Sequence, residues 1–552
     1  MGVAPRSYGA TPLLIVSVGI GETRSSLVLR SKSAVIIHKM GDRCRRTAIE
    51  LLFLQFKTTY YPTENYLLDM TTTTNLQPKA VFDLFAAINK VPRPSKHEEK
   101  IIEYLVQFGK EHGLETEVDE VGNVIIRKPA TPGMEGHPTV ILQSHSDMVC
   151  EKNADVEHDF MNDPIQTYVD GEWLRAKGTT LGADDGIGMA MQMAVLIDDT
   201  IKHGPLECVF TRDEETGLTG AMGLKSGFMK GQYLINLDSE DEGQIFVSCA
   251  GGARTMGWWQ LATEAMPEGF FTFRVKVSGL RGGHSGDDIN KFRANANRLL
   301  VRFLCDEMEK TDLRLVDIQS GGLHNAIPRE GWALCAVPYS YKEQVRVDLN
   351  HYLAALDEEI RAAEPDFQIE LESQPAATTS LESEGVKRML LSLRAVTNGV
   401  YAMSYDMAGL VETSSNLASI HLLENGRVEV ATSQRSSVGS AREDISAAVR
   451  AAFQLGGAEV ETTEGYPGWK MNPNSRLLEV ATESYRRLFG KEAQVLAIHA
   501  GLECGLFSEK YPGLDMISVG PTLRGVHSPE ERLHIPTVQL VWDHLLDILQ
   551  NL

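Results

Sequence analysis

The sequence is short of the features that mark secreted, membrane-spanning or nucleic-acid-binding proteins. Its seven cysteines include no CxxC pair and are odd in number, so they indicate reduced thiols and favour a cytoplasmic protein. The apolar run at residues 13–21 covers nine residues, whereas a helix that crosses a membrane needs about 20. We therefore expect no disulfide framework and no membrane partner.

Basic residues are also scarce. Lysine and arginine number 53 against 75 aspartates and glutamates, which gives a formal net charge of −22. This excess of negative charge argues against nucleic acid as a partner and favours solubility, but it does not indicate a substrate. The hydrophobic share of 43% and the charged share of 23% are ordinary for a globular enzyme. At 552 residues the chain is too long for one compact core, so we expect two or more domains.

Residues 1–76 differ from the rest of the chain. They are rich in arginine and lysine, contain five acidic residues, and include a run of four threonines at residues 71–74. Organellar presequences have a similar composition, but a disordered extension, or a start site further along at Met70, fits better. We predict an N-terminal extension over residues 1–76 and a cytoplasmic location, with organellar targeting as the alternative.

A regular alternation of patterns begins after residue 76. Apolar, strand-like stretches occur at residues 123–126, 139–143, 206–211, 233–237 and 515–520. Apolar residues at helical spacing lie between some of them, notably over residues 96–112 and 186–197. This rhythm predicts an α/β fold in which helices cover both faces of a sheet.

Acidic and histidine side chains lie next to these stretches. His145 and Asp147 follow the stretch at 139–143, Glu214 and Glu215 follow 206–211, Asp238 follows 233–237, His527 lies beyond 515–520, and Asp184 opens an apolar stretch at 181–197. In an open α/β sheet the carboxyl ends of the strands form the crevice where ligands bind. We therefore expect these side chains to converge on one place.

The chemistry of this set suits two metal ions. Three carboxylates, two neutral imidazoles and a bridging hydroxide would balance two zinc ions and leave positions for water and substrate. Glu214 then remains as a general base. Taken singly, each residue is more often an ordinary surface or core residue, but together at strand ends they predict a two-metal hydrolytic site.

Several segments resemble the metal motifs of the aminoacyl-histidine dipeptidases. This family, also called Xaa-His or β-alanyl-histidine dipeptidases, belongs to the co-catalytic zinc metallopeptidases related to the carnosinases and carboxypeptidase G. The matching segments are HSDMV at 145–149, LGADDGIG at 181–188, DEETG at 213–217, NLDSE at 236–240, GGHSG at 282–286, NAIPR at 325–329, YPGW at 466–469, HAGLECG at 499–505 and HSP at 527–529. The resemblance covers roughly residue 77 to the C-terminus. One departure is Asp185, where the motif is expected to read ADNG.

The resemblance implies a role for each residue. It assigns His145 and Asp238 to one zinc ion, Glu215 and His527 to the other, and Asp184 as the bridge between them. It makes Asp147 the residue that orients the imidazole of His145, and Glu214 the general base. It implies that His284 stabilises the oxyanion. It also implies that the substrate is bound by Asn325, Arg435 and Gly501. It also implies a cis peptide bond between Asp184 and Asp185.

The resemblance further implies the domain organisation. We expect a zinc-peptidase-like α/β catalytic domain, with a mixed sheet flanked by helices, in two parts at residues 77–252 and 466–552. An α/β lid domain at residues 253–465 interrupts it. Residues 249–253 and 466–469 are expected to act as hinges. Within the insertion, residues 271–277 alternate as in a strand and residues 295–304 have the pattern of a helix. A lid of this kind closes over the site and expels water.

The predicted function is that of a metallodipeptidase that hydrolyses Xaa-His dipeptides such as carnosine. We expect two Zn²⁺ per subunit, with Mn²⁺ or Co²⁺ as alternatives, small dipeptides as substrates, and a homodimer as the candidate assembly. No serine, cysteine or threonine motif of the nucleophilic type accompanies the site. An aminoacylase or carboxypeptidase acting on N-acyl amino acids is the alternative. A catalytically inert scaffold is disfavoured because Glu214 is present beside all five ligands.

Overall fold

The computed structural model describes residues 14–20, 23–29 and 76–552 of the chain. The chain divides into two units, residues 1–71 and residues 72–552. In the first unit, β1 (Leu14–Ile20) and β2 (Thr23–Leu29) form an antiparallel hairpin. Most of the predicted N-terminal extension lies outside the described residues, so its disordered or presequence character stays a prediction.

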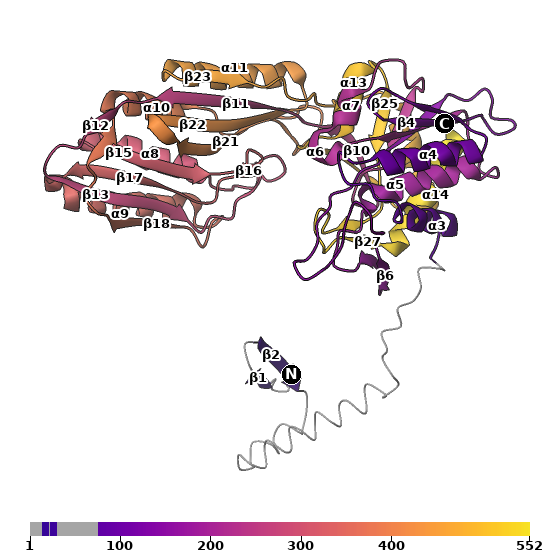
Figure 1. Ribbon diagram of the computed structural model, residues 1–552, viewed down its shortest axis with the longest axis horizontal. Helices are drawn as coiled ribbons and strands as arrows, with labels where there is room; N and C mark the ends of the chain where they lie inside the picture. The colour runs from indigo at the N-terminus through magenta and orange to yellow at the C-terminus, as the bar shows by residue number, and fades with distance from the viewer. Residues whose placement is uncertain (1–13, 21–22, 30–75) are drawn as a thin grey trace, which may run out of the picture. The chain divides into compact units, whose positions relative to one another are not determined.

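The second unit contains an eight-stranded mixed sheet (Figure 1). In spatial order its strands are β24 (Gln494–Ile498), β10 (Gln244–Cys249), β25 (Asp515–Ser518), β9 (Tyr233–Asn236), β5 (Val140–His145), β8 (Leu206–Thr211), β4 (Val124–Lys128) and β3 (Glu115–Val118). The four central strands β25, β9, β5 and β8 run parallel to one another. Their carboxyl ends therefore lie at one edge of the sheet.

Helices cover both faces of this sheet, as the alternating pattern predicts. Strand residues alternate between the two faces, so that Val140 and Leu142 of β5 belong to one core cluster and Ile141 to another. The first face is covered by α3 (Lys79–Ile88), α4 (Glu99–Glu111), α5 (Ala183–Ile197), α12 (Arg476–Phe489) and α14 (Ile535–Asn551), and the second by α7 (Thr219–Gly223) and α13 (Glu503–Lys510). The fold class expected from the sequence, a mixed sheet flanked by helices, is confirmed.

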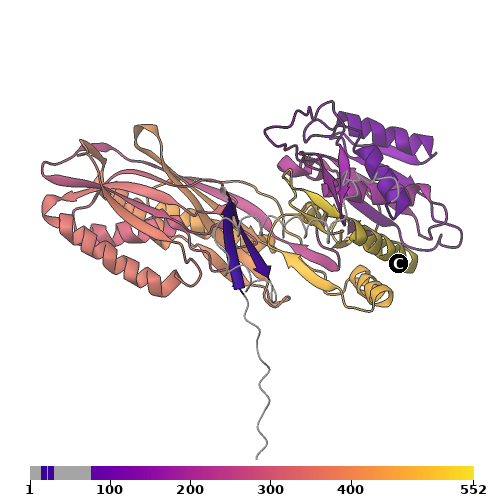
Figure 2. The same cartoon turned by 90° about the horizontal axis from the view of Figure 1, so that it is seen from below.

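A nine-stranded antiparallel sheet occupies most of the predicted insertion. It contains β18 (Gln368–Ser373), β13 (Phe270–Ser278), β17 (Gly331–Pro338), β15 (Arg314–Gly321), β21 (Val411–Leu422), β22 (Arg427–Ser436), β11 (Gly251–Gln260) and β23 (Glu459–Thr462), with β20 (Gly399–Met403) paired to β21. One hydrophobic core joins this sheet to α8 (Ala296–Lys310), α9 (Lys342–Ile360), α10 (Ser383–Ala395) and α11 (Gly439–Leu455). Both ribbon views show helices packed along this sheet (Figures 1 and 2). The insertion thus has its own core.

The remaining elements are short. They are the four-stranded sheet of β26 (Leu523–Arg524), β27 (Arg532–His534), β7 (Trp173–Ala176) and β6 (Thr167–Asp170), the pairs β12 (Thr263–Ala265) with β19 (Thr379–Leu381) and β14 (Gly283–His284) with β16 (Ala326–Ile327), the helix α6 (Glu214–Gly217), and the 3-10 helices η2 (Tyr339–Tyr341) and η3 (Glu424–Gly426). None of the helices in the described part of the chain combines the length and apolar character that a bilayer crossing requires. The six cysteines in that part are all unpaired thiols.

The two segments predicted as hinges lie side by side. Cys249 donates its N–H to the carbonyl of Trp469 at 2.9 Å, and Gly252 donates to Tyr466 at 3.0 Å. A side chain at Gly251 would place its Cβ 2.5 Å from the backbone of Tyr466, so only glycine fits this close approach. The domain boundaries at 252/253 and 465/466 stay predictions, since hinge motion is a separate property from this pairing.

Candidate metal centre

The residues that the sequence placed at strand ends lie at the carboxyl edge of the central parallel strands. His145 is the last residue of β5, Asp238 follows β9, and Glu214 and Glu215 open α6 shortly after β8. Asp184 lies at the start of α5, and His527 lies in the loop between β26 and β27, where it has a positive φ of 61°. The peptide bond between Asp184 and Asp185 is cis, as expected.

The carboxylate of Asp184 lies between the two histidines. Its Oδ1 is 3.0 Å from His145 Nε2, and its Oδ2 is 3.2 Å from His527 Nε2. On the first side, Asp238 Oδ1 lies 3.6 Å from His145 Nε2. On the second side, Glu215 Oε2 lies 2.9 Å from His527 Nε2. The five residues therefore form two groups that share one carboxylate.

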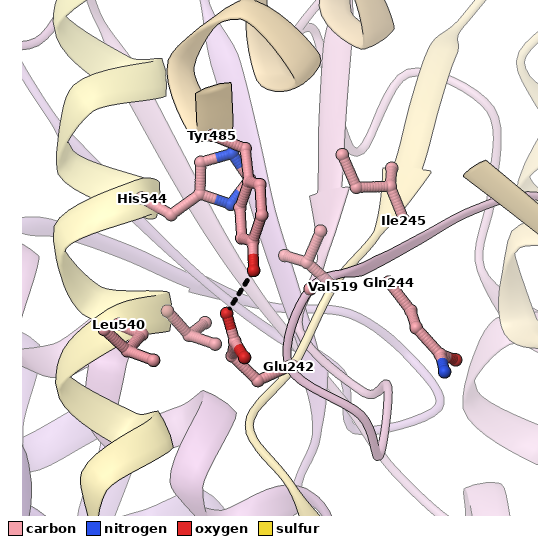
Figure 3. Close-up of a pocket in the computed structure, with 10 residues that line it drawn as sticks. Glu242, Gln244, Ile245, Tyr485, Val519, Leu540 and His544 are labelled. Carbon is pink, nitrogen blue, oxygen red and sulfur yellow. Dashed lines mark hydrogen bonds between the residues drawn. The ribbon is translucent and has the colours of Figure 1, made fainter. Parts of the chain in front are cut away.

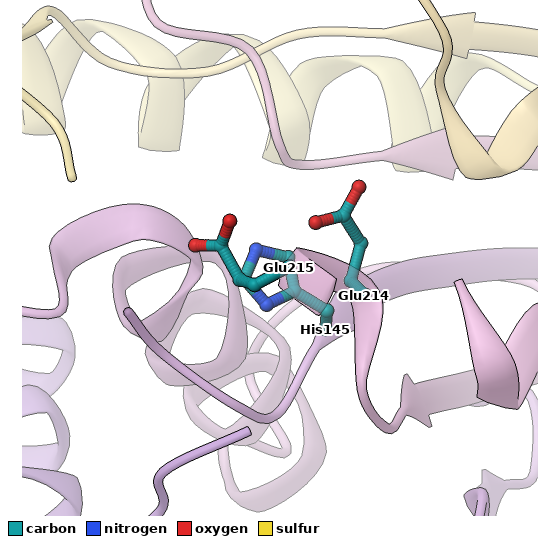
Figure 4. Close-up of side chains that lie close together, drawn as sticks. All are labelled: His145, Glu214 and Glu215. Carbon is teal, nitrogen blue, oxygen red and sulfur yellow. The ribbon is translucent and has the colours of Figure 1, made fainter. Parts of the chain in front are cut away.

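The carboxylate of Asp147 contacts His145 and the backbone of both adjacent glutamates. Its Oδ1 lies 3.3 Å from His145 Nδ1, and its carboxylate accepts the backbone N–H of Glu214 at 3.0 Å and of Glu215 at 3.3 Å. Ser95 Oγ donates to the same carboxylate at 2.7 Å. Figure 4 shows the side chains of both glutamates beside the imidazole of His145. Within residues 76–552, the Glu215 carboxylate is paired with His527, whereas the Glu214 carboxylate has no hydrogen-bond or ion-pair partner.

The electrostatics of the cluster are those of a cation site. Burial lowers the pKa of His145, but the carboxylates of Asp147, Asp184 and Asp238 outweigh it and raise that pKa well above its usual value. Hydrogen bonds to Asp184 and Glu215 raise the pKa of His527 to about 11. Burial, with repulsion from Asp238, Glu503 and Glu215, raises the pKa of Glu214 well above the usual range. The negative potential therefore favours positive charge at both histidines.

The donor set fits two divalent metal ions. His145, Asp184 and Asp238 place one ligand atom each within 4.8 Å of one another, and Asp184, Glu215 and His527 do the same. Glu215 Oε1 is buried and has no hydrogen-bond partner within the described residues. Imidazole and carboxylate donors are those that zinc, manganese and cobalt sites use in proteins. The residues present thus suit a metal centre with a shared carboxylate.

A buried polar network that the sequence did not reveal lies beneath this cluster. Gln143 of β5 donates to Glu503 Oε2 at 2.6 Å and accepts from Asn236 of β9 at 2.7 Å, and Asn236 accepts from Ser518 of β25. Thr211 of β8 donates to Glu503 Oε2 at 2.8 Å. All five side chains are buried. Four of these residues belong to the central strands, and the fifth, Glu503, begins α13. Their hydrogen bonds therefore fix the ends of the strands relative to one another and to α13.

The residues predicted in the insertion form a second group. Arg435 of β22 donates from Nη2 to His284 Nε2 at 3.3 Å and from Nη1 to Tyr466 Oη at 3.1 Å. Asn325 is exposed and accepts the N–H of Ser285 through its carbonyl at 2.8 Å. Gly501 packs on Tyr466, since a Cβ there would lie 2.7 Å from the ring. No hydrogen bond or ion pair within residues 76–552 joins this group to the clustered acids and histidines.

Arg435 is buried, with 6% of its surface exposed, and has no carboxylate partner in the described part of the chain. Its Nε also lacks a hydrogen-bond partner there. A buried guanidinium is normally paired with an acid, because an isolated buried charge is costly. Arg435 is therefore not a surface charge, and its environment suits an anionic ligand.

A separate polar cavity lies beneath the C-terminal helix and contains none of these residues. Tyr485, Glu242 and His544 line it, and Tyr485 Oη donates to the Glu242 carboxylate (Figure 3). His544 Nε2 is bonded to the carbonyl of Ala481 at 2.8 Å. With its one carboxylate engaged, this cavity has no group of metal ligands comparable to that around Asp184.

Comparison with known proteins agrees with the geometry. The model of peptidase family M20/M25/M40 matches residues 141–551, which is most of the chain. The chain belongs to this peptidase family. A cytosol non-specific dipeptidase from Escherichia coli (strain K12) is 44% identical over 483 residues, which are 88% of this chain and 99% of that protein.

Solved structures resemble the chain as well. The crystal structure of aminoacylhistidine dipeptidase from Vibrio alginolyticus matches with a TM-score of 0.83 and 43% identity, covering 87% of this chain and 98% of that one. A tripeptidase from Staphylococcus aureus matches with a TM-score of 0.50 and 16% identity over 86% of this chain and 98% of that one, a likeness of fold alone. The family membership shows that the chain is a peptidase of the expected fold.

Proposed function

We propose that the protein is a dinuclear zinc dipeptidase that hydrolyses Xaa-His dipeptides such as carnosine. The observation that carries the proposal is the Asp184 carboxylate, whose two oxygens lie 3.0 Å and 3.2 Å from two different histidines. A carboxylate disposed in this way can bridge two cations. The two similar proteins that share over 40% of their residues with this chain are both named as dipeptidases, which supports the substrate class.

The metal ligands follow from the two groups around Asp184. His145 and Asp238 would hold one ion, Glu215 and His527 the other, and Asp184 both. When bound, two such ions polarise the peptide carbonyl and make a bound water nucleophilic at neutral pH. We propose zinc, with Mn²⁺ or Co²⁺ as alternatives, because histidine and carboxylate donors accept all three.

Glu214 would act as the general base that transfers the proton. Its carboxylate has no partner within the described residues, and its raised pKa suits a group that takes a proton from water and returns it to the leaving amine. Asp147, 3.3 Å from His145 Nδ1, would orient the imidazole and keep Nε2 available as a ligand atom.

The insertion residues would bind the substrate. His284 would stabilise the oxyanion of the tetrahedral intermediate, and Arg435 would bind the terminal carboxylate of a dipeptide. Asn325 and Gly501 would complete the substrate site. The hydrogen bond of 3.3 Å between Arg435 and His284 supports their acting on neighbouring parts of one small molecule. A cytoplasmic location and a homodimer complete the proposal.

A substrate panel with metal analysis tests this function. Purified protein would be assayed with carnosine, other histidine-terminal dipeptides, dipeptides without histidine and N-acetyl amino acids, and its zinc content would be measured. We expect two zinc ions per chain and the highest kcat/KM for histidine-terminal dipeptides. Faster cleavage of N-acetyl amino acids would favour the aminoacylase or carboxypeptidase alternative. No cleavage of any substrate by the zinc-loaded protein would favour an inert scaffold.

A further inference from the structure

The turn that carries Asp184 is not held by regular secondary structure. Asp184 has φ −81° and ψ 109°, and Asp185 has φ −107° and ψ 38°, although both lie within the bounds of α5. The backbone N–H groups of such a turn lack the partners that a helix provides, and buried N–H groups need partners. Some other group must therefore fix the carboxylate that lies between the two histidines.

Glu531 supplies those partners. Its Oε2 accepts the N–H of Leu181 at 2.7 Å and of Gly182 at 3.0 Å, and its Oε1 accepts the N–H of Ala183 at 2.8 Å and of Asp184 at 3.4 Å. Only 2% of Glu531 is exposed, so water does not compete for these bonds. Hydrogen bonds from backbone N–H groups to an ionised carboxylate are stronger than those between neutral groups. Both oxygens of Glu531 thus hold the turn.

Arg93 holds the same turn through its carbonyl side. Its Nη2 donates to the carbonyl of Gly182 at 2.6 Å, and its Nη1 donates to the carbonyl of Asp147 at 3.0 Å. Gly182 has a φ of +65°, and a Cβ there would lie 2.6 Å from Arg93 Nη2, so this position requires glycine. Burial lowers the pKa of Arg93, and the nearby charges of Glu531 and Asp147 offset part of that effect.

Glu531 also belongs to the segment that carries His527. It lies four residues beyond His527, and its N–H donates to the carbonyl of Ser528 at 3.0 Å. The next residue, Arg532, begins β27, which pairs with β7. One side chain therefore ties the loop of His527 to the turn of Asp184.

We propose that Glu531 is a positioning residue that sets the spacing between Asp184 and His527, and thereby the affinity for the metal ion that these two residues share with Glu215. The inference rests on the proposed metal centre and adds a residue to it. The competing interpretation is a carboxylate that only stabilises the fold. A residue of that kind lowers thermal stability without changing the metal affinity of the folded protein.

The variant Glu531→Gln tests the proposal on the full-length protein. The amide keeps the shape of the side chain, but it presents an NH₂ group to N–H donors and loses acceptors for two of the four bonds. Zinc affinity would be measured by competition with a chromophoric chelator, alongside far-UV circular dichroism and thermal unfolding. We expect the dissociation constant of one zinc ion to rise about 10- to 100-fold, the usual effect of losing a residue that orients a ligand. Added zinc should restore kcat with KM unchanged.

The matched control is Glu530→Gln. Glu530 is the preceding residue, but its side chain is 71% exposed and pairs with Arg175. We expect this variant to have the zinc affinities of the unaltered protein. Glu531→Asp keeps the charge on a shorter side chain, and we expect it to raise the same dissociation constant by a smaller factor. If Glu531→Gln does not fold, this variant tests whether Glu531 sets the zinc affinity.

Unchanged zinc affinity in the Glu531 variants, or a loss of thermal stability alone, would overturn the proposal. Zinc affinity is measured without any hydrolysis, so a failure of the proposal for Glu531 can be distinguished from a failure of the proposed dipeptidase function. An unaltered protein that binds two zinc ions but cleaves no dipeptide would refute the proposed function, while the comparison of affinities would still decide the role of Glu531.

Discussion

At the scale of single residues, the adjacent glutamates 214 and 215 differ in what their carboxylates contact. Asp147 accepts the backbone N–H of both, so their main chain is fixed in common. The Glu215 carboxylate lies 2.9 Å from His527 Nε2, whereas the Glu214 carboxylate has no partner within residues 76–552. A ligand needs a fixed position next to the other ligands, and a base needs freedom to accept a proton. The contacts therefore support different roles for the two residues.

Glu214→Gln is expected to abolish most of the activity while the metal remains bound. The amide has nearly the same shape but cannot accept the proton, and loss of a general base typically lowers the rate about 100- to 10,000-fold. Steady-state kinetics and metal analysis of the same sample would test this. Turnover close to that of the unaltered enzyme would show that Glu214 is not the base. As the matched control, Glu215→Gln should lose one of the two metal ions.

Arg435→Lys is expected to raise KM sharply for free dipeptides. A guanidinium binds a carboxylate through two parallel hydrogen bonds, and an ammonium group does not reproduce that geometry. The unaltered enzyme should also cleave C-amidated dipeptides poorly, because they lack the same charge. Both results would be read from kcat/KM for one dipeptide in its free and amidated forms. Equal cleavage of the two forms would exclude this role for Arg435.

The sequence indicated the clustered residues because each of them lies next to a recognisable apolar stretch. It did not indicate Glu531, Arg93 or Glu503. These side chains bond to backbone groups or to uncharged residues far along the chain, such as Glu503 to Gln143 and Glu531 to Leu181. Contacts of this kind leave no periodic pattern, so they become visible only when the fold brings the segments together.

At the scale of elements, the strands that carry the cluster were the most predictable part of the chain. The stretch at 206–211 coincides with β8, and the stretch at 233–237 exceeds β9 by one residue. Buried central strands are almost entirely apolar and have sharp ends, which explains this agreement. The helix expected over residues 295–304 extends to Lys310, because its last turns carry charged residues that obscure the apolar pattern. Strand order could not be predicted, since it depends on pairing between distant segments.

A pH-dependent contact lies between α8 and α9 of the insertion. Glu307 is buried, and burial together with repulsion from Asp348 raises its pKa to about 7, although Lys310 is 3.3 Å away. The ordinary pKa of a glutamate is 4.5, so between about pH 4.5 and 7 the folded state binds a proton that the unfolded state releases. The contribution of Glu307 to stability is therefore present at low pH and declines as the pH rises through 7.

The variant Glu307→Gln isolates this effect. Thermal midpoints of the variant and the unaltered protein would be compared between about pH 5 and pH 8, a range that covers the titration of Glu307. We expect the midpoint of the unaltered protein to fall relative to that of the variant as the pH rises, because the amide does not titrate. A constant difference between the two proteins across this range would show that Glu307 does not carry the raised pKa.

At the scale of the whole molecule, the proposed metal ions would join parts of the chain that the insertion separates. His145, Asp184, Glu215 and Asp238 precede the insertion, and His527 follows it. The eight-stranded sheet is likewise built from both parts, with β25 and β24 added to strands that precede the insertion. The two sides meet at Asp184 and Glu215, each within 3.2 Å of His527. The proposed metal centre is thus a contact between the two parts of the sheet.

Metal removal is accordingly expected to destabilise the protein. Without cations, the carboxylates of Asp184, Glu215 and Asp238 lie close together, and only protonated histidines offset their repulsion. A ligand that binds only the folded state stabilises it by about 2.7 kcal/mol at a concentration 100 times its dissociation constant. Dialysis against a chelator should therefore lower the thermal midpoint, and zinc should restore it. In His527→Ala, where the contact across the insertion is lost, zinc should restore less. An equal zinc-dependent shift in this variant and in the unaltered protein would show that His527 does not join the two parts through a metal ion.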